Sequence, residues 1–293
     1  MFRSLAAGAV LLLGPHGAGW LQAATAAPPT SIDRIIATVT INGQGPLRFM
    51  LDTGATQAVI AQSAVRRLGL RPEPGRRIEV LGINGRVSAA AVHIDSLESG
   101  ALQFRNLDMA VLSGPVFDGL DGILGIDGLR DMSLTVDFLR QRCVISAARP
   151  QRLSAFAVVP LHIRSLRLPM VAGRVGNIGV QVIVDTGAAH TLGNPALLAA
   201  LRRAGELQAS RAAPPVIDAT AMAQDGDVVS TPALRLGNVT LSGLGVTFGD
   251  YPIFGIWGLS GQPAVLLGMD ALGTLAWFSI DYPHLELRLL PRS

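Results

Sequence analysis

The sequence predicts a mainly β protein made of two similar lobes related by a pseudo-two-fold axis, with a few short helices. The tetrapeptide Asp-Thr-Gly-Ala occurs twice, starting at Asp52 and at Asp185, and each copy follows an apolar segment. An apolar-apolar-Gly motif follows each copy and ends at Gly125 or at Gly268. The remaining segments are mostly strand-forming residues and turn residues. A repeat this long indicates a duplicated domain and not a solenoid.

The N-terminus has the pattern of a secretory signal peptide over residues 1–26. Arg3 supplies a positive charge, Leu5 to Leu13 form a short apolar core, and Ala24-Thr25-Ala26 offers a cleavage site between small residues. We therefore expect export to a bacterial periplasm or to the medium. An uncleaved leader that anchors the chain to the membrane is the alternative. We expect no stable membrane span after leader cleavage, because no later segment is long and apolar enough.

The rest of the chain divides into an N-terminal lobe at 27–149 and a C-terminal lobe at 150–293, each long enough for its own core. In each lobe a β-rich segment, a turn and a second β-rich segment lead into the Asp-Thr-Gly-Ala motif. A short helix follows each motif, and in the second lobe Asn194 and Pro195 are typical helix-start residues. The expected strands are 34–41, 46–51, 170–175 and 180–184, the turns are Asn42-Gly43 and Gly176-Asn177, and the helices are 61–68 and 195–203.

Composition excludes several classes of protein. Hydrophobic residues make up 49% of the chain and charged residues 15%, which excludes a disordered chain. The net charge is +3 and the arginines are scattered, so we expect no nucleic-acid partner. The histidines show no metal-ligand spacing, and we expect no metal and no other cofactor. Cys143 is the single cysteine; it lies in an apolar strand pattern and is expected in the core.

These motifs identify a resemblance to a known family. Both halves resemble retropepsin-type aspartic protease domains, over about residues 33–148 and 157–291, and the whole resembles a bacterial single-chain form with two fused domains. The resemblance implies two retropepsin-like acid-protease lobes with Asp52 and Asp185 as catalytic residues at their interface. It also implies residues that support the two catalytic loops, namely Thr53, Gly54, Thr186, Gly187, Gly125 and Gly268.

Two carboxylates at a shared interface cannot both ionise cheaply, so one stays protonated while the other acts as a base. We therefore expect an aspartic endopeptidase in which a water molecule between Asp52 and Asp185 hydrolyses peptide bonds. The expected partner is a polypeptide substrate, and the chain is expected to be a monomer. The alternatives are a non-catalytic peptide-binding protein that retains the acid-protease fold, and a single-domain enzyme that dimerises.

The family also places a β-hairpin flap over its substrate, between each catalytic loop and the following glycine strand. Residues 78–87 fit such a hairpin, with Gly82, Ile83, Asn84 and Gly85 at its substrate-binding tip. The second candidate is 216–229, centred on Asp225-Gly226. Flap backbone groups would bind an extended peptide by strand addition. The alternative for either segment is an ordinary surface hairpin.

Overall fold

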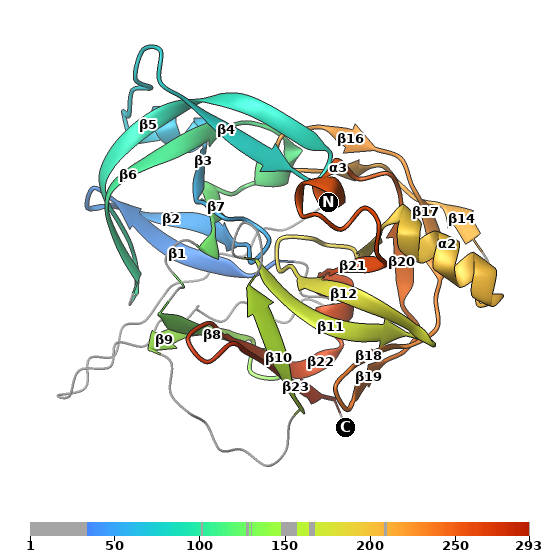
Figure 1. Ribbon diagram of the computed structural model, residues 1–293. Helices are drawn as coiled ribbons and strands as arrows, with labels where there is room; N and C mark the ends of the chain where they lie inside the picture. The colour runs from blue at the N-terminus through green and yellow to red at the C-terminus, as the bar shows by residue number, and fades with distance from the viewer. Residues whose placement is uncertain are drawn as a thin grey trace.

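The computed structural model describes residues 34–100, 102–126, 129, 131–147, 157–163, 168–207 and 210–292. The expected leader, 1–26, lies outside these residues. The described chain is built mainly from β-strands with four short α-helices, as the sequence predicts (Figure 1). None of the helices in the described part is long and apolar enough to cross a membrane. Below, "first half" means residues 34–147 and "second half" means residues 157–292.

Seven strands of the first half form one sheet in the order β1-β2-β7-β3-β6-β5-β4. The pairing of β2 with β7 and of β3 with β6 is parallel, and the other neighbours along this path are antiparallel. The seven strands are β1 (Ile36–Ile41), β2 (Gln44–Leu51), β3 (Val59–Ala61), β4 (Arg77–Gly82), β5 (Gly85–Ser99), β6 (Leu102–Leu112) and β7 (Gly122–Leu124).

The second half repeats this order as β11-β12-β21-β13-β20-β17-β14. Each strand therefore has a counterpart in the first sheet, and the parallel pairs recur between β12 and β21 and between β13 and β20. The seven strands are β11 (Pro169–Val175), β12 (Ile178–Val184), β13 (Leu192–Gly193), β14 (Ser210–Ala212), β17 (Asp227–Ser230), β20 (Gly245–Phe248) and β21 (Ala264–Leu267). This matching topology confirms the pseudo-two-fold relation between the halves.

A set of five strands joins the halves at the lower side of Figure 1, in the order β10-β23-β22-β8-β9. At its centre β8 of the first half pairs antiparallel with β22 of the second half. Thr135 and Ser279, equivalent positions of the two halves, face each other there, and the Thr135 hydroxyl donates to Ser279 Oγ at 2.9 Å. The strands are β8 (Met132–Asp137), β9 (Arg142–Ala147), β10 (Ala157–Ile163), β22 (Leu275–Asp281) and β23 (Glu286–Pro291).

The remaining elements are short. Two small hairpins belong to the second half, and they are β15 (Val216–Ile217) with β16 (Ala223–Gln224) and β18 (Leu234–Leu236) with β19 (Val239–Leu241). The helices are α1 (Gln62–Arg67), the 3-10 helix η1 (Pro115–Phe117), α2 (Pro195–Ala204), α3 (Pro252–Ile256) and α4 (Met269–Leu272).

The local sequence signals explain these elements. The turn at Asn42 and Gly43 has positive φ at both residues, 50° and 73°, as the Asn-Gly pair predicts. Helix α2 begins where predicted, because Asn194 Oδ1 accepts a hydrogen bond from Leu197 N at 2.9 Å. Cys143 is buried in β9, and burial raises the pKa of its thiol to about 12. The core position predicted for this cysteine is therefore confirmed.

Candidate active site

The two Asp-Thr-Gly-Ala loops lie at equivalent ends of two central strands. Asp52 directly follows β2, and its backbone N–H donates to Leu124 O of β7 at 3.0 Å. Asp185 directly follows β12, and its N–H donates to Leu267 O of β21 at 3.0 Å. Both strands end in consecutive buried apolar residues, because each is covered on two faces at the centre of its sheet. Both aspartates lie at the interface between the halves, because each carboxyl group is next to the glycine of the opposite loop.

The two threonines of the motifs tie the loops together across this interface. Thr53 N donates to Thr186 Oγ1 at 3.1 Å, and Thr186 N donates to Thr53 Oγ1 at 3.0 Å. Each hydroxyl donates in turn to the opposite chain, Thr53 to Val184 O at 2.7 Å and Thr186 to Leu51 O at 2.8 Å. Neither threonine is accessible to solvent. All donors and acceptors of this buried set are paired, so the loops are held in one relative position.

These reciprocal threonine hydrogen bonds predict a large loss of stability when one hydroxyl is removed. Thr53→Val keeps the shape of the side chain but leaves Thr186 N and Val184 O buried without their partner. We expect the free energy of unfolding to fall by about 2–4 kcal/mol, since each orphaned polar group costs about 1–3 kcal/mol. Denaturant titration measures this loss. The matched control is Thr240→Val on the exposed side of β19, which should change stability by about 0.5 kcal/mol or less.

The loops also bring the two carboxyl groups together. Asp52 Oδ1 accepts from Gly54 N at 2.8 Å and Ala55 N at 3.0 Å, and Asp185 Oδ1 accepts from Gly187 N at 2.8 Å. Each motif glycine lies against the opposite carboxyl group. A Cβ at Gly54 would lie 2.5 Å from Asp185 Oδ2, and one at Gly187 would lie 2.3 Å from Asp52 Oδ2. Only glycine permits this approach, which explains the Gly at both positions.

Burial and mutual repulsion disfavour ionisation of both carboxyl groups. Burial raises the pKa of Asp52 well above its ordinary value, and the charge of Asp185 raises it further. Burial also raises the pKa of Asp185, while hydrogen bonds from Asp52 and from nearby backbone N–H groups lower it. Like charges this close cannot both form at low cost. The arrangement therefore favours a pair of carboxyl groups that holds one proton in common.

The two predicted loop-support glycines lie beneath the loops. Ile126, the residue after Gly125, donates from its backbone N to Ala55 O at 2.9 Å. Met269, the residue after Gly268, makes the equivalent bond to Ala188 O at 2.8 Å. A Cβ at Gly125 would lie 2.7 Å from the backbone carbonyl carbon of Gln57. A Cβ at Gly268 would lie 2.6 Å from the backbone of His190. Both glycines thus allow the same close backbone approach in the two halves.

The segment predicted as the first flap is a hairpin, since β4 and β5 pair up to Gly82 and Gly85 with Ile83 and Asn84 in the turn. The described contacts bring this tip to the second half and not to the aspartates.

The centre expected for the second hairpin is wrong. Its turn lies at 218–222, between β15 and β16, and not at Asp225-Gly226. The Asp218 side chain explains the difference, because it accepts from Thr220 N at 2.9 Å and so closes the turn there.

Sequence reasoning missed two residues. Asp218 carries no motif, and its contact with the first hairpin joins segments that are 134 residues apart. Tyr282 follows Asp281, the last residue of β22. Its counterpart in the first half is Phe138, which follows Asp137, the last residue of β8. The Tyr282 hydroxyl is buried and has no partner among the described residues, and burial and the charge of Asp52 both raise its pKa. The signal that could have found Tyr282 is this difference between the two repeats.

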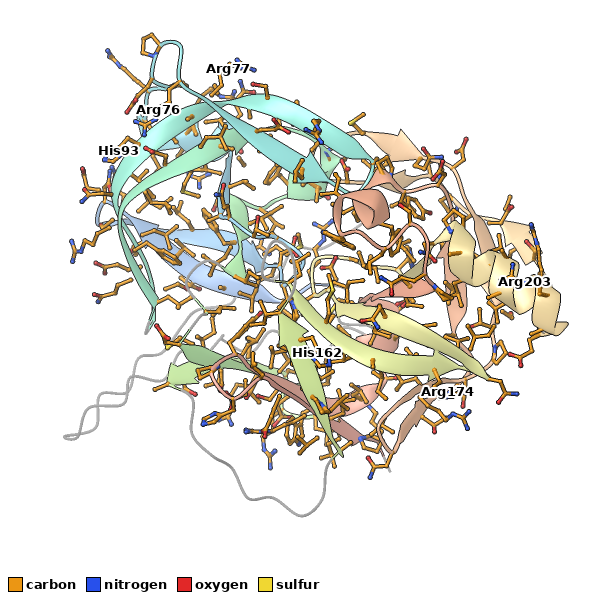
Figure 2. All side chains as sticks on the ribbon, viewed as in Figure 1. Arg76, Arg77, His93, His162, Arg174 and Arg203 are labelled. Atoms are coloured by element: carbon orange, nitrogen blue, oxygen red, sulfur yellow. The ribbon has the colours of Figure 1, made fainter. Side chains whose placement is uncertain are left out.

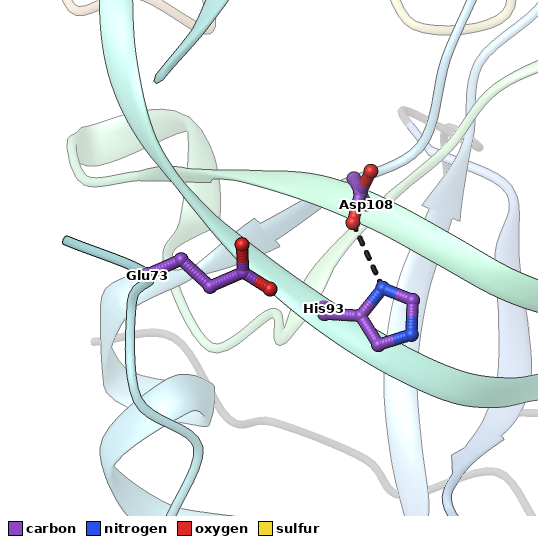
Figure 3. A group of neighbouring side chains, drawn as sticks. All are labelled: Glu73, His93 and Asp108. Atoms are coloured by element: carbon purple, nitrogen blue, oxygen red, sulfur yellow. Dashed lines mark hydrogen bonds and ion pairs between the residues drawn. The ribbon is translucent and has the colours of Figure 1, made fainter. Parts of the chain in front are cut away.

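A separate group of metal-binding residue types lies on the first half. Glu73, His93 and Asp108 approach one another at β5 and β6, with His93 Nδ1 and Asp108 Oδ1 at 2.9 Å (Figure 3). Arg76 already donates to both carboxylates, at 2.8 Å to Glu73 and also to Asp108. The guanidinium supplies the positive charge that an ion would otherwise provide. Figure 2 shows Arg76 and His93 at the outer edge of the first half, far from Arg174 and Arg203 of the second half.

The comparison with protein families agrees with this geometry. A family model described as "Aspartyl protease" matches residues 37–127 and 171–271. The two matched regions contain both Asp-Thr-Gly-Ala loops and together cover more than half of the chain. The chain therefore belongs to this aspartyl protease family, and the matched regions agree with two fused retropepsin-like units. A search of curated proteins found no match.

Proposed function

We propose that this protein is an aspartic endopeptidase that hydrolyses peptide bonds with a water molecule activated between Asp52 and Asp185. The observation that carries the proposal is the joint placement of the two carboxyl groups. Each lies in a loop held by the reciprocal threonine bonds, and each lies against the motif glycine of the other loop. Family membership supports the same reaction class.

The proposed mechanism uses the single proton of the pair. The ionised carboxylate takes a proton from the water as its oxygen attacks the carbonyl carbon of the substrate. The protonated carboxyl group donates its proton to the carbonyl oxygen, which gives a tetrahedral diol. In the second step this same group, now a carboxylate, takes a proton from a diol hydroxyl, while the other carboxyl group passes the water proton to the amine nitrogen and the C–N bond breaks. The pair returns to its starting protonation, so no metal, cofactor or covalent intermediate is required. The N–H groups of Gly54 and Gly187 orient the two carboxyl groups through their Oδ1 atoms.

The hairpin tip at Gly82, Ile83, Asn84 and Gly85 is proposed as the flap over the substrate. Figure 1 supports this role, because β4 and β5 reach across toward α3 and β16 on the side opposite β8 and β22. The ends of β2 and β12 lie between these two levels. An extended peptide held there would lie along the hairpin and be bound through backbone groups.

The proposed units are the lobes 27–149 and 150–293, and the proposed active form is a monomer, because each lobe supplies one aspartate. The substrate is a polypeptide, and a leader at 1–26 would direct export. Sedimentation of the fraction that cleaves peptide tests this expectation. Because both aspartates belong to one chain, the active species should sediment as a monomer.

A peptide-library digest analysed by mass spectrometry tests the reaction. The protein is incubated with the library at several pH values, with and without a statine-type inhibitor. We expect new peptide ends that the inhibitor suppresses. If the protein binds intact peptides from the library and cleaves none of them at any pH, the result would instead support a peptide-binding protein that keeps the acid-protease fold.

The raised pKa values predict that the pair destabilises the fold at neutral pH. The folded chain binds the carboxyl protons more tightly than the unfolded chain, and this tighter binding stabilises the fold. The stabilisation is present at low pH and is lost as pH rises through the raised pKa values. Asp52→Asn keeps the acceptor for Gly54 N and removes one ionisable group. We therefore expect a higher Tm than wild type at pH 7, by about 3 °C for each kcal/mol gained.

Thermal unfolding at pH 7 and at pH 3 measures this effect. At pH 3 both carboxyl groups of the wild type are protonated, so the difference in Tm should largely disappear. Asp250→Asn, at an exposed position, is the control and should show no such pH-dependent gain. A variant that is less stable than wild type at pH 7 would contradict the raised pKa values.

A further inference from the structure

The first-half hairpin is joined to the second half by side-chain hydrogen bonds at its tip. Asn84 N donates to Asp218 Oδ2 at 2.7 Å. The Asn84 side-chain Nδ2 donates to Val216 O of β15 at 2.7 Å and to Met222 O, just before β16, at 2.8 Å. Beside these bonds, Ile253 N of α3 donates to Ile83 O at 3.2 Å. The tip of one hairpin thus fits into the turn of the other.

Both side chains at this junction are enclosed and fixed. Asn84 is 8% exposed and Asp218 is 4% exposed. The second oxygen of Asp218, Oδ1, accepts from Thr220 N and from Thr220 Oγ1, at 2.9 and 2.6 Å, so the carboxylate cannot turn away freely. A Cβ at Gly82 would lie 2.2 Å from Asp218 Oδ2. A glycine at this position of the hairpin therefore makes the junction possible.

The junction is also incomplete, which makes it suited to opening. Asn84 Oδ1 is buried and has no hydrogen-bond partner among the described residues. This oxygen loses its bond to water when the hairpins close, and the loss offsets part of what the three bonds of Asn84 contribute. The closed state is thus stabilised by a small difference between opposing contributions.

We propose that Asn84 and Asp218 form a latch between the two hairpins, and that the hairpins part at this latch to admit a substrate chain. The proposal rests on the proposed peptidase function. Access matters because the aspartates are largely covered: Asp185 is 5% exposed and Asp52 is half-buried, and the strands β8 and β22 cross the interface on the other side. The bonds from the hairpin tip to the β15–β16 turn and to α3 hold the two hairpins together, and an extended chain can enter when these bonds open.

The first test measures the latch without catalysis, by hydrogen exchange at the amide of Ile253. This amide is bonded to Ile83 O across the junction, so its exchange reports opening at a residue that is not substituted. Asn84→Asp places a carboxylate oxygen against Val216 O and Met222 O and adds a like charge beside Asp218. We expect exchange at Ile253 to rise about tenfold or more. Asn84→Ala, which removes the two donors without adding charge, should show a smaller rise.

The matched control is Asn177→Asp, which makes the same change in the exposed turn between β11 and β12. We expect wild-type exchange at Ile253 in this variant. A second disruptive variant, Gly82→Ala, pushes the hairpin from Asp218 by bulk alone and should raise the exchange as Asn84→Asp does. Wild-type exchange at Ile253 in both Asn84→Asp and Gly82→Ala, with the fold intact by circular dichroism, would overturn the latch.

The second test links the latch to access. The association rate of a statine-type peptide inhibitor is measured by stopped flow, and we expect it to rise about tenfold in Asn84→Asp and to stay unchanged in Asn177→Asp. Faster exchange with an unchanged association rate would overturn the role in access. A wild-type protein that does not bind the inhibitor at all would instead contradict the proposed function, while the exchange measurement still decides on the latch.

Discussion

Replacement of Asp185 by Asn is expected to reduce peptide cleavage by about 10³-fold or more and to leave the fold intact. The amide oxygen of Asn keeps the bond from Gly187 N, so the loop retains its shape. The substitution removes the second ionisable carboxyl group, and the remaining Asp52 cannot act as base and acid in the same step. Asp52→Asn should cause a loss of the same order, because the two loops are equivalent.

Initial rates on a peptide identified in the library digest measure this loss. Asp95→Asn, at an exposed position of β5 away from both hairpin tips, is the control for loss of one negative charge and should retain full activity. Circular dichroism and thermal unfolding establish that each variant is folded. Cleavage within tenfold of wild type in either active-site variant would rule out a water molecule shared by the two carboxyl groups.

The second large effect is expected at the glycine beneath the second loop. Gly268→Ala should lower the free energy of unfolding by about 2–3 kcal/mol, because the added Cβ meets backbone atoms that cannot rotate away. The nearest atoms are the carbonyl carbon and oxygen of His190, each at 2.6 Å, and Ala188 O at 3.0 Å. Peptide cleavage should fall as well, since Ala188 belongs to the second Asp-Thr-Gly-Ala loop, which the clash displaces.

Gly179→Ala in β12 is the matched control. No atom lies within 4 Å of the position where its Cβ would stand, and the backbone there does not have a positive φ. Urea titration of the two variants should therefore separate them clearly. A Gly268→Ala variant as stable as Gly179→Ala would show that the loop and the strand do not need this close approach.

The sequence predicts the centre of the molecule well, for a physical reason. The two Asp-Thr-Gly-Ala loops follow buried strands, need threonine to bond across the interface and need glycine against the opposite carboxyl group. These requirements fall on consecutive residues, so they leave a short motif that appears once in each half. The start of α2 is similarly local, because Asn194 and Leu197 lie within one turn.

The features that sequence reasoning missed depend on contacts between distant segments. Asn84 and Asp218 come together only after both hairpins fold, and neither residue type is unusual in a turn. The centre of the second hairpin was misplaced because Asp-Gly at 225–226 is a strong turn signal in isolation. In the folded chain the bonds to Asp218 determine where the turn closes, and Gly226 lies where a Cβ would meet Phe248 O at 2.7 Å.

A crystal structure of the protein with a bound statine-type inhibitor tests the central proposal most directly. We predict that the inhibitor hydroxyl, which takes the place of the attacking water, lies within hydrogen-bond distance of carboxyl oxygens of both Asp52 and Asp185. An inhibitor that binds elsewhere, or whose hydroxyl contacts only one of the two carboxyl groups, would contradict it.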